Sequence, residues 1–141
     1  MKTFRKKRYA LCAVIIPLVL GAGIYIAVCP DVWFVSKINR VLGIQQVSPD
    51  DLHPVAAFVR NYLCDLLWAY ALTGTLLLIS GETMCVWSPV IAVLLGIVLE
   101  LLQRTGIITG TADVFDIVAE AAGAAAATMV YIYGRKQHEN K

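Results

Sequence analysis

Four long apolar segments constrain this chain more than any other feature of its sequence. They cover residues 9–28, 59–79, 86–103 and 114–133. Each has about the 20 residues that an α-helix needs to cross a hydrocarbon layer roughly 30 Å thick. Backbone N–H and C=O groups find no water in that layer, so a spanning segment must be helical. We therefore expect an all-α integral membrane bundle of four transmembrane helices, formed by a single domain over residues 1–141.

The placement of basic residues predicts the orientation of this bundle. They crowd the segment 2–8 before the first apolar segment, and Arg135 and Lys136 follow the last one. The positive-inside rule then places both termini in the cytoplasm, which an even number of crossings requires. The first segment has an alternative reading as a cleaved signal peptide, but its length and the absence of an A-x-A site favour a retained helix.

A shorter amphipathic segment over residues 31–43 follows the first apolar segment. Trp33, Val35, Ile38 and Leu42 recur at near-helical spacing, while polar side chains fill much of the other face. Such a pattern is typical of a helix lying in the headgroup region, with Trp33 as an interfacial anchor. A loop folded over the bundle is the alternative.

Ionisable and carboxamide side chains gather at one end of the last three apolar segments. They are Arg60, Asn61 and Asp65 at the start of the second segment, Glu100, Gln103 and Arg104 at the end of the third, and Asp113, Asp116 and Glu120 at the start of the fourth. Because successive spans run in opposite directions, all three sets are expected at one depth near the outer face. The cytoplasmic halves of the same three segments contain no charge.

The spacing of these side chains predicts which of them share a helix face. Asp113, Asp116 and Glu120 lie at positions i, i+3 and i+7, so their carboxylates form one stripe. Glu100 and Arg104 form an i, i+4 pair in the favourable order. A charged side chain inside a bilayer costs at least about 2.5 kcal/mol, so such residues usually face the bundle interior.

Two further patterns bear on the same end of the bundle. Asn61 and Asp65 are four residues apart, which places both on one face of a regular helix. The stretch 119–128 consists almost entirely of small residues, and these allow helix backbones to approach closely. Asp113 has two readings, as part of a polar site or as the N-cap of the last helix.

The balance of charge in this set separates two interpretations. Four carboxylates, those of Asp65, Glu100, Asp116 and Glu120, meet two nearby arginines. An ion-pair latch that holds three helices together needs no such surplus of acid. A pocket that binds an amphiphile, or acts on it at headgroup depth, accounts for the surplus and is the interpretation that we favour.

The stretch LELLQRTGIITGTADVFDIVAEAAGAAAA resembles the VanZ-like family of small membrane proteins. The resemblance covers about residues 60–130. Its elements are Glu100 and Gln103 before a short outer loop, Asp113 or Asp116 opening the last helix, and Glu120 and Gly123 in a helix of small residues. The chain departs from the pattern where many members carry Asn in place of Glu120, and it lacks their proline in the second helix.

The resemblance implies a role in the bacterial cell envelope, in the plasma membrane, of the kind associated with glycopeptide resistance. We expect the chain to bind or process a lipid headgroup or a lipid-linked envelope precursor. If the site is catalytic, Glu100, Asp116 and Glu120 are the acid/base or cation-holding groups. The arginines Arg60 and Arg104 would then clamp an anionic group such as phosphate.

Two other functions remain open. In the first, the protein is a non-catalytic assembly partner whose polar cluster only holds helices together. In the second, it is a small transporter, which the charge-free cytoplasmic halves disfavour because they offer no polar route across the membrane.

Several classes of function find no support in the sequence. It contains no phosphate-binding loop, no H-E-x-x-H motif and no nucleotide fingerprint. The four cysteines show no paired spacing and His53 reads as a solvated loop residue, so we assign no metal-ligating residues and expect neither a zinc site nor a disulfide framework. The sequence leaves open whether a cation or metal occupies the acidic site. The basic segment 2–8 adjoins a membrane helix, which indicates contact with anionic lipid rather than nucleic acid. The residues leave cofactor, oligomeric state and catalysis open.

Overall fold

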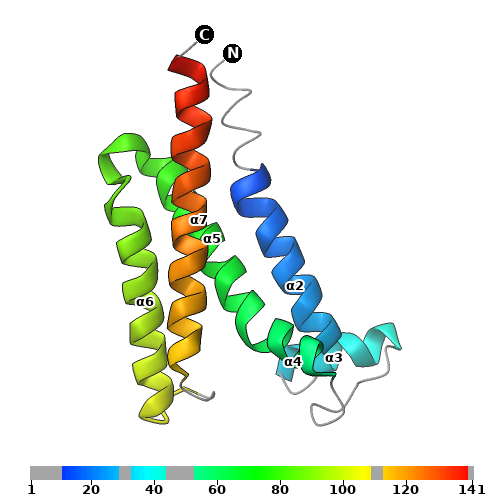
Figure 1. Cartoon of the computed structure of the whole chain (residues 1–141). Coiled ribbons are helices and arrows are strands. Elements are labelled where there is room, and N and C mark those ends of the chain that lie inside the picture. The colour runs from blue at the N-terminus through cyan, green and yellow to red at the C-terminus, as the bar shows by residue number, and fades with distance from the viewer. Residues whose placement is uncertain (1–10, 29–32, 44–52, 109–112, 140–141) are drawn as a thin grey trace.

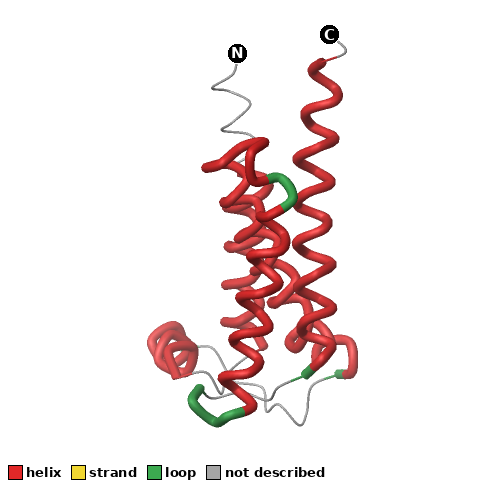
Figure 2. The backbone as a smooth tube through the Cα atoms, turned by 90° about the vertical axis from the view of Figure 1, so that its left-hand side faces the viewer, coloured by secondary structure: helices red, strands yellow, loops and turns green. Residues whose placement is uncertain are grey.

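The computed structural model describes residues 11–28, 33–43, 53–108 and 113–139. All secondary-structure elements in these ranges are helices (Figure 2), which confirms the all-α prediction. The elements are the π-helix η1 (Leu11–Ile15), α2 (Ile16–Val28), α3 (Trp33–Leu42), α4 (Pro54–Phe58), the π-helix η3 (Val59–Leu63), α5 (Cys64–Ser80), the 3₁₀ turn η4 (Gly81–Met84), α6 (Trp87–Arg104) and α7 (Val114–Glu139).

Three helical stretches are long and apolar enough to span a membrane. They are Pro54–Ser80, Trp87–Arg104 and Val114–Lys136, and they contain the last three predicted spans almost entirely. The first predicted span, 9–28, is helical from Leu11 to Val28, and a fully described apolar stretch, Ala13–Ile24, lies within it. Residues 9 and 10 lie outside the described part of the chain. The fourth crossing therefore stays a prediction.

Helix α5 is the central element of the bundle and packs against α7, α6 and α2. Figure 1 shows that α5 and α7 run in the same direction, while α6 and α2 run in the opposite one. The end of α6 and the starts of α5 and α7 thus lie at the same end of the molecule. We call this end, where Glu100, Asp113 and Asp116 lie, the acidic end.

Small residues set the closest helix contacts. A side chain at Gly123 would collide with the backbone carbonyl of Leu66, so α5 and α7 cross with almost no space between their backbones. A Cβ at Gly74 would lie 2.7 Å from the carbonyl oxygen of Ala13, at the contact between α5 and the first helix. Close approach of this kind is the usual role of glycine and alanine in membrane bundles.

The ends of α5 and α6 are built by glycines in the left-handed region. Gly81 has φ +62° and follows the last residue of α5, and Gly106 has φ +75° beyond α6. The amide of Gly106 donates to the carbonyl of Gln103 at 2.9 Å, and that of Ile107 to Leu102 at 3.1 Å. These bonds pair carbonyls that a helix end otherwise leaves open.

The segment predicted at 31–43 forms the helix α3 rather than a loop, with residues 31 and 32 outside the described part. Asn39 is 2% exposed, and its Nδ2 donates to the carbonyl oxygen of Ile26 at 3.2 Å. Ile26 lies in the last turn of α2, so this bond pairs a carbonyl at the end of that helix. The bond fixes α3 crosswise beneath α2, as Figure 1 shows.

Candidate functional site

Asp113 links the three helices that meet at the acidic end. Its Oδ1 accepts a hydrogen bond from the amide of Phe115 at 3.0 Å, which caps the start of α7. Its Oδ2 accepts one from the hydroxyl of Tyr62 at 3.2 Å, and Tyr62 lies in η3, which leads into α5. Its own amide donates to Oε2 of Glu100 on α6 at 2.9 Å. Asp113 is thus an N-cap and at the same time the centre of a polar network.

Further carboxylates lie around this network. Asp65 on α5 and Asp116 and Glu120 on α7 are close enough to interact electrostatically with one another and with Glu100. Asp113 acts in the same way on Asp116. We refer to these five residues as the carboxylate cluster. The cluster brings together acidic side chains from three helices whose positions in the sequence span more than 50 residues.

Glu120 is the most deeply placed member of the cluster. It is 5% exposed, and its Oε2 is buried without a hydrogen-bond partner. Its carboxyl group lies directly over Gly96 of α6, at a position that any side chain on Gly96 would occupy. The missing side chain of Gly96 therefore makes the space in which the Glu120 carboxyl group sits. A buried acceptor without a donor is unfavourable by about 1–3 kcal/mol, so this oxygen is suited to a ligand that carries a donor.

Basic side chains do not neutralise the cluster within the described part of the chain. No ion pair within 4 Å joins a described Lys or Arg to any of its five carboxylates. Arg104 is exposed and does not pair with Glu100, although the two are spaced for it. The side chain of Arg60 lies outside the described residues. Among the described residues, the hydrogen bonds through Asp113 and the close packing at Gly123 link these helices, and an ion-pair latch that involves Arg60 stays a prediction.

The other predicted site residues have varied positions. Asn61 is exposed and is not part of the hydrogen-bonded network. Gln103 is half-buried, and its Oε1 is buried without a hydrogen-bond partner. The sequence reasoning missed Tyr62 and Gly96. Tyr62 could have been found as a tyrosine in an apolar segment, because a buried phenol usually needs a hydrogen-bond partner. Nothing in the sequence distinguishes Gly96 from other helical glycines.

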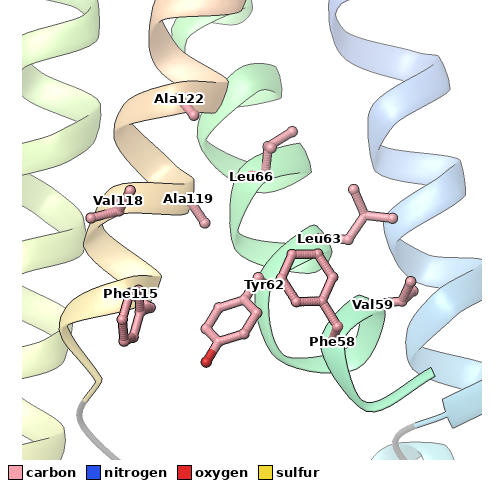
Figure 3. A pocket seen from close by; sticks show the side chains of 9 residues that line it. All are labelled: Phe58, Val59, Tyr62, Leu63, Leu66, Phe115, Val118, Ala119 and Ala122. Atoms are coloured by element: carbon pink, nitrogen blue, oxygen red, sulfur yellow. The ribbon is translucent and has the colours of Figure 1, made fainter. Parts of the chain in front are cut away.

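An apolar groove adjoins this network on the α5–α7 face (Figure 3), with a volume of about 440 Å³. It is lined by Phe58, Val59, Tyr62, Leu63, Leu66, Phe115, Val118, Ala119 and Ala122. The ring of Tyr62 is the centre of an aromatic group, with centroids 5.1 Å from Phe58 and 6.2 Å from Phe115. Tyr62 therefore belongs to both features, since its ring lines the groove and its hydroxyl donates to the carboxylate cluster.

Among the described residues, no three His, Cys, Asp or Glu side chains are arranged to hold a metal ion. Comparison with known proteins adds no assignment, because no family model, no curated protein and no solved structure matches this chain. The evidence for function is therefore the apolar spans, the carboxylate cluster and the groove beside it.

Proposed function

We propose that this chain is a multi-pass protein of the bacterial plasma membrane whose carboxylate cluster binds the polar headgroup of an envelope lipid or lipid-linked precursor. The observation that supports this proposal most directly is the environment of Glu120. Its carboxylate is buried beside other carboxylates, one of its oxygens has no hydrogen-bond partner, and no described basic side chain forms an ion pair with it. Ionisable groups within membrane spans usually serve function, because their burial is otherwise unfavourable.

The proposed depth of the site follows from the orientation that the sequence predicts. With both termini in the cytoplasm, the acidic end faces outward and the cluster lies at the level of the outer headgroups. The resemblance of the stretch 99–127 to VanZ-like proteins supports an envelope role of this kind. Glu100, Asp116 and Glu120 would accept hydrogen bonds from the headgroup, or exchange protons with it if the site is catalytic.

A second candidate is an assembly partner without a ligand. The observation that favours it is the hydrogen-bonded chain from Tyr62 through Asp113 to Glu100, which ties three helices together without any bound group. A chain with that role alone would tolerate matched substitutions at Glu120, which is outside those bonds.

The test is binding of lipids to the purified full-length chain and to the variants Asp116→Asn and Glu120→Gln. Native mass spectrometry on protein extracted in mild detergent and offered a mixture of envelope lipids measures the bound fraction. Both variants should lose roughly tenfold or more in lipid affinity, since a hydrogen bond to a charged group contributes about 1.5–3 kcal/mol.

Glu82→Gln is the matched control, because Glu82 lies in η4 at the opposite end of α5. It removes a carboxylate at the other end of α5 from the cluster, and lipid binding should be unchanged. If Asp116→Asn and Glu120→Gln bind lipid as the unmodified chain does, the cluster is not a headgroup site and the assembly role gains support.

A further inference from the structure

We infer that the apolar groove holds the hydrocarbon chain of a lipid whose headgroup carries a primary ammonium group, bound at the Tyr62–Asp113 edge of the carboxylate cluster. This inference rests on the proposed function and names the class of ligand. The groove and the cluster are two parts of one site, which together fit an amphiphile with a positively charged end.

The shape and lining of the groove fit a hydrocarbon chain. Its volume of about 440 Å³ lies in the range of small-molecule sites, roughly 300–1,000 Å³. All its lining side chains except Tyr62 are apolar. Ala119 and Ala122 leave the hollow on α7, opposite Leu66 on α5, while Phe58 and Phe115 flank the end near Tyr62 (Figure 3).

Tyr62 fixes where the polar end of the ligand would lie. Its ring lines the groove, and its hydroxyl donates to Asp113 at 3.2 Å. Asp116 acts electrostatically on the same hydroxyl. A chain that fills the groove with its polar end at Tyr62 therefore brings its headgroup to the edge of the cluster.

The charge of the cluster selects the headgroup. Five carboxylates lie together with no ion pair to a described basic side chain, so a cation is complementary to them. The buried and unpartnered oxygen of Glu120 shows independently that the cluster has acceptor capacity to spare. A primary ammonium offers three N–H donors to such acceptors, whereas a quaternary ammonium offers none. A helix of a second copy would fill the groove but leave this charge unpaired.

The structure provides a matched control groove of about 480 Å³ between α6 and α7. Its lining includes Val90, Leu94, Ala121 and Ala125, and none of its lining residues is charged. Ala122 and Ala125 are both exposed on α7, three residues apart, and each lines only one of the two grooves. Ala122→Phe therefore blocks the proposed chain site, and Ala125→Phe places the same bulk in the control groove.

The experiment uses the full chain reconstituted in phosphatidylglycerol vesicles that contain a small fraction of photoactivatable lipid. The probe is phosphatidylethanolamine with a diazirine in its acyl chain, compared with the phosphatidylcholine analogue. Cross-links are located by peptide mass spectrometry. We expect cross-links to groove residues with the ethanolamine probe and severalfold fewer with the choline probe. Ala122→Phe should reduce them roughly tenfold, as the loss of two buried methylenes would, and Ala125→Phe should leave them unchanged.

The outcomes separate this inference from the proposed function. If Asp116→Asn lowers lipid binding but Ala122→Phe does not, the groove inference is wrong and the headgroup site stands. If neither the carboxylate variants nor Ala122→Phe changes labelling, both proposals are wrong. Equal labelling by the two probes overturns the choice of a primary ammonium. A disulfide-linked dimer that forms with Ala122→Cys and not with Ala125→Cys would assign the groove to a second copy and overturn the lipid chain.

Discussion

Replacing Gly123 by alanine tests the contact that brings the acidic side chains of α5 and α7 together. The added Cβ would meet the Cα, carbonyl carbon and oxygen of Leu66, which are backbone atoms and cannot rotate away. The two helices would have to separate by roughly 1 Å or more to restore an ordinary contact of about 3.5 Å. Overpacking of a close contact usually destabilises a protein by about 1–3 kcal/mol.

Gly134 offers the matched control on the same helix. It is exposed, and a Cβ there has no neighbour within 4 Å. Gly134→Ala should therefore stabilise the helix by up to about 1 kcal/mol through propensity alone. The two variants should differ by about 1–4 kcal/mol in free energy of unfolding. Titration with SDS in mixed micelles, followed by far-UV circular dichroism, measures that difference. Equal stabilities of Gly123→Ala and Gly134→Ala would refute the close crossing of α5 and α7.

Three other substitutions test contacts around the site and the first helix. Gly96→Ala should displace the Glu120 carboxyl group and weaken lipid binding. In a double-mutant cycle with Glu120→Ala, the effect of Gly96→Ala on the free energy of unfolding should change by about 1 kcal/mol or more, and additive effects would contradict the contact. Tyr62→Phe removes the hydroxyl bond to Asp113 and should destabilise the bundle by about 1.5 kcal/mol in the same SDS titration, with no change if the bond is absent. Asn39→Ala removes the bond to Ile26 and should weaken the attachment of α3 to α2 by about 1 kcal/mol. Amide hydrogen exchange should then be faster in residues 33–42 while α6 stays protected, and unchanged exchange in α3 would contradict the bond.

Hydrophobic length and periodicity were sufficient to predict the helices. The three segments 59–79, 86–103 and 114–133 are long apolar runs, and for such runs the need to pair every backbone group leaves only the helix. The first segment is likewise helical over Leu11–Val28, beginning with the π-helix η1, and its crossing of the membrane stays a prediction. Counting apolar residues does not reveal where a helix loses its regular turn.

The acidic end was predictable in its membership but not in its bonding. Charge counting placed Glu100, Asp113 and Glu120 at one depth, and the structure brings them together. The expected Glu100–Arg104 pair is not formed, because the amide of Asp113 satisfies an oxygen of Glu100 instead. The amide of Asp113 reaches Glu100 only in the folded bundle, where the end of α6 lies beside the start of α7. Gly96 could not be found from the sequence for the same reason, since its role depends on which side chain lies opposite.

The π-helix at Val59–Leu63 interrupts the regular α-helical turn of the second span. Side chains before and after it therefore do not follow one common α-helical spacing. A π turn accommodates one residue more than an α turn and is often found at functional sites. Deleting Leu63, the last residue of this stretch, would let the backbone close into a continuous α-helix, and each residue of an α-helix turns the chain by about 100°. Everything before the deletion would then swing round relative to α5, and Tyr62 would no longer face Asp113. The π-helix therefore sets the position of Tyr62, and with it the end of the groove, relative to the carboxylate cluster. Removing one apolar residue there would separate the groove from the cluster and leave every polar side chain in the sequence.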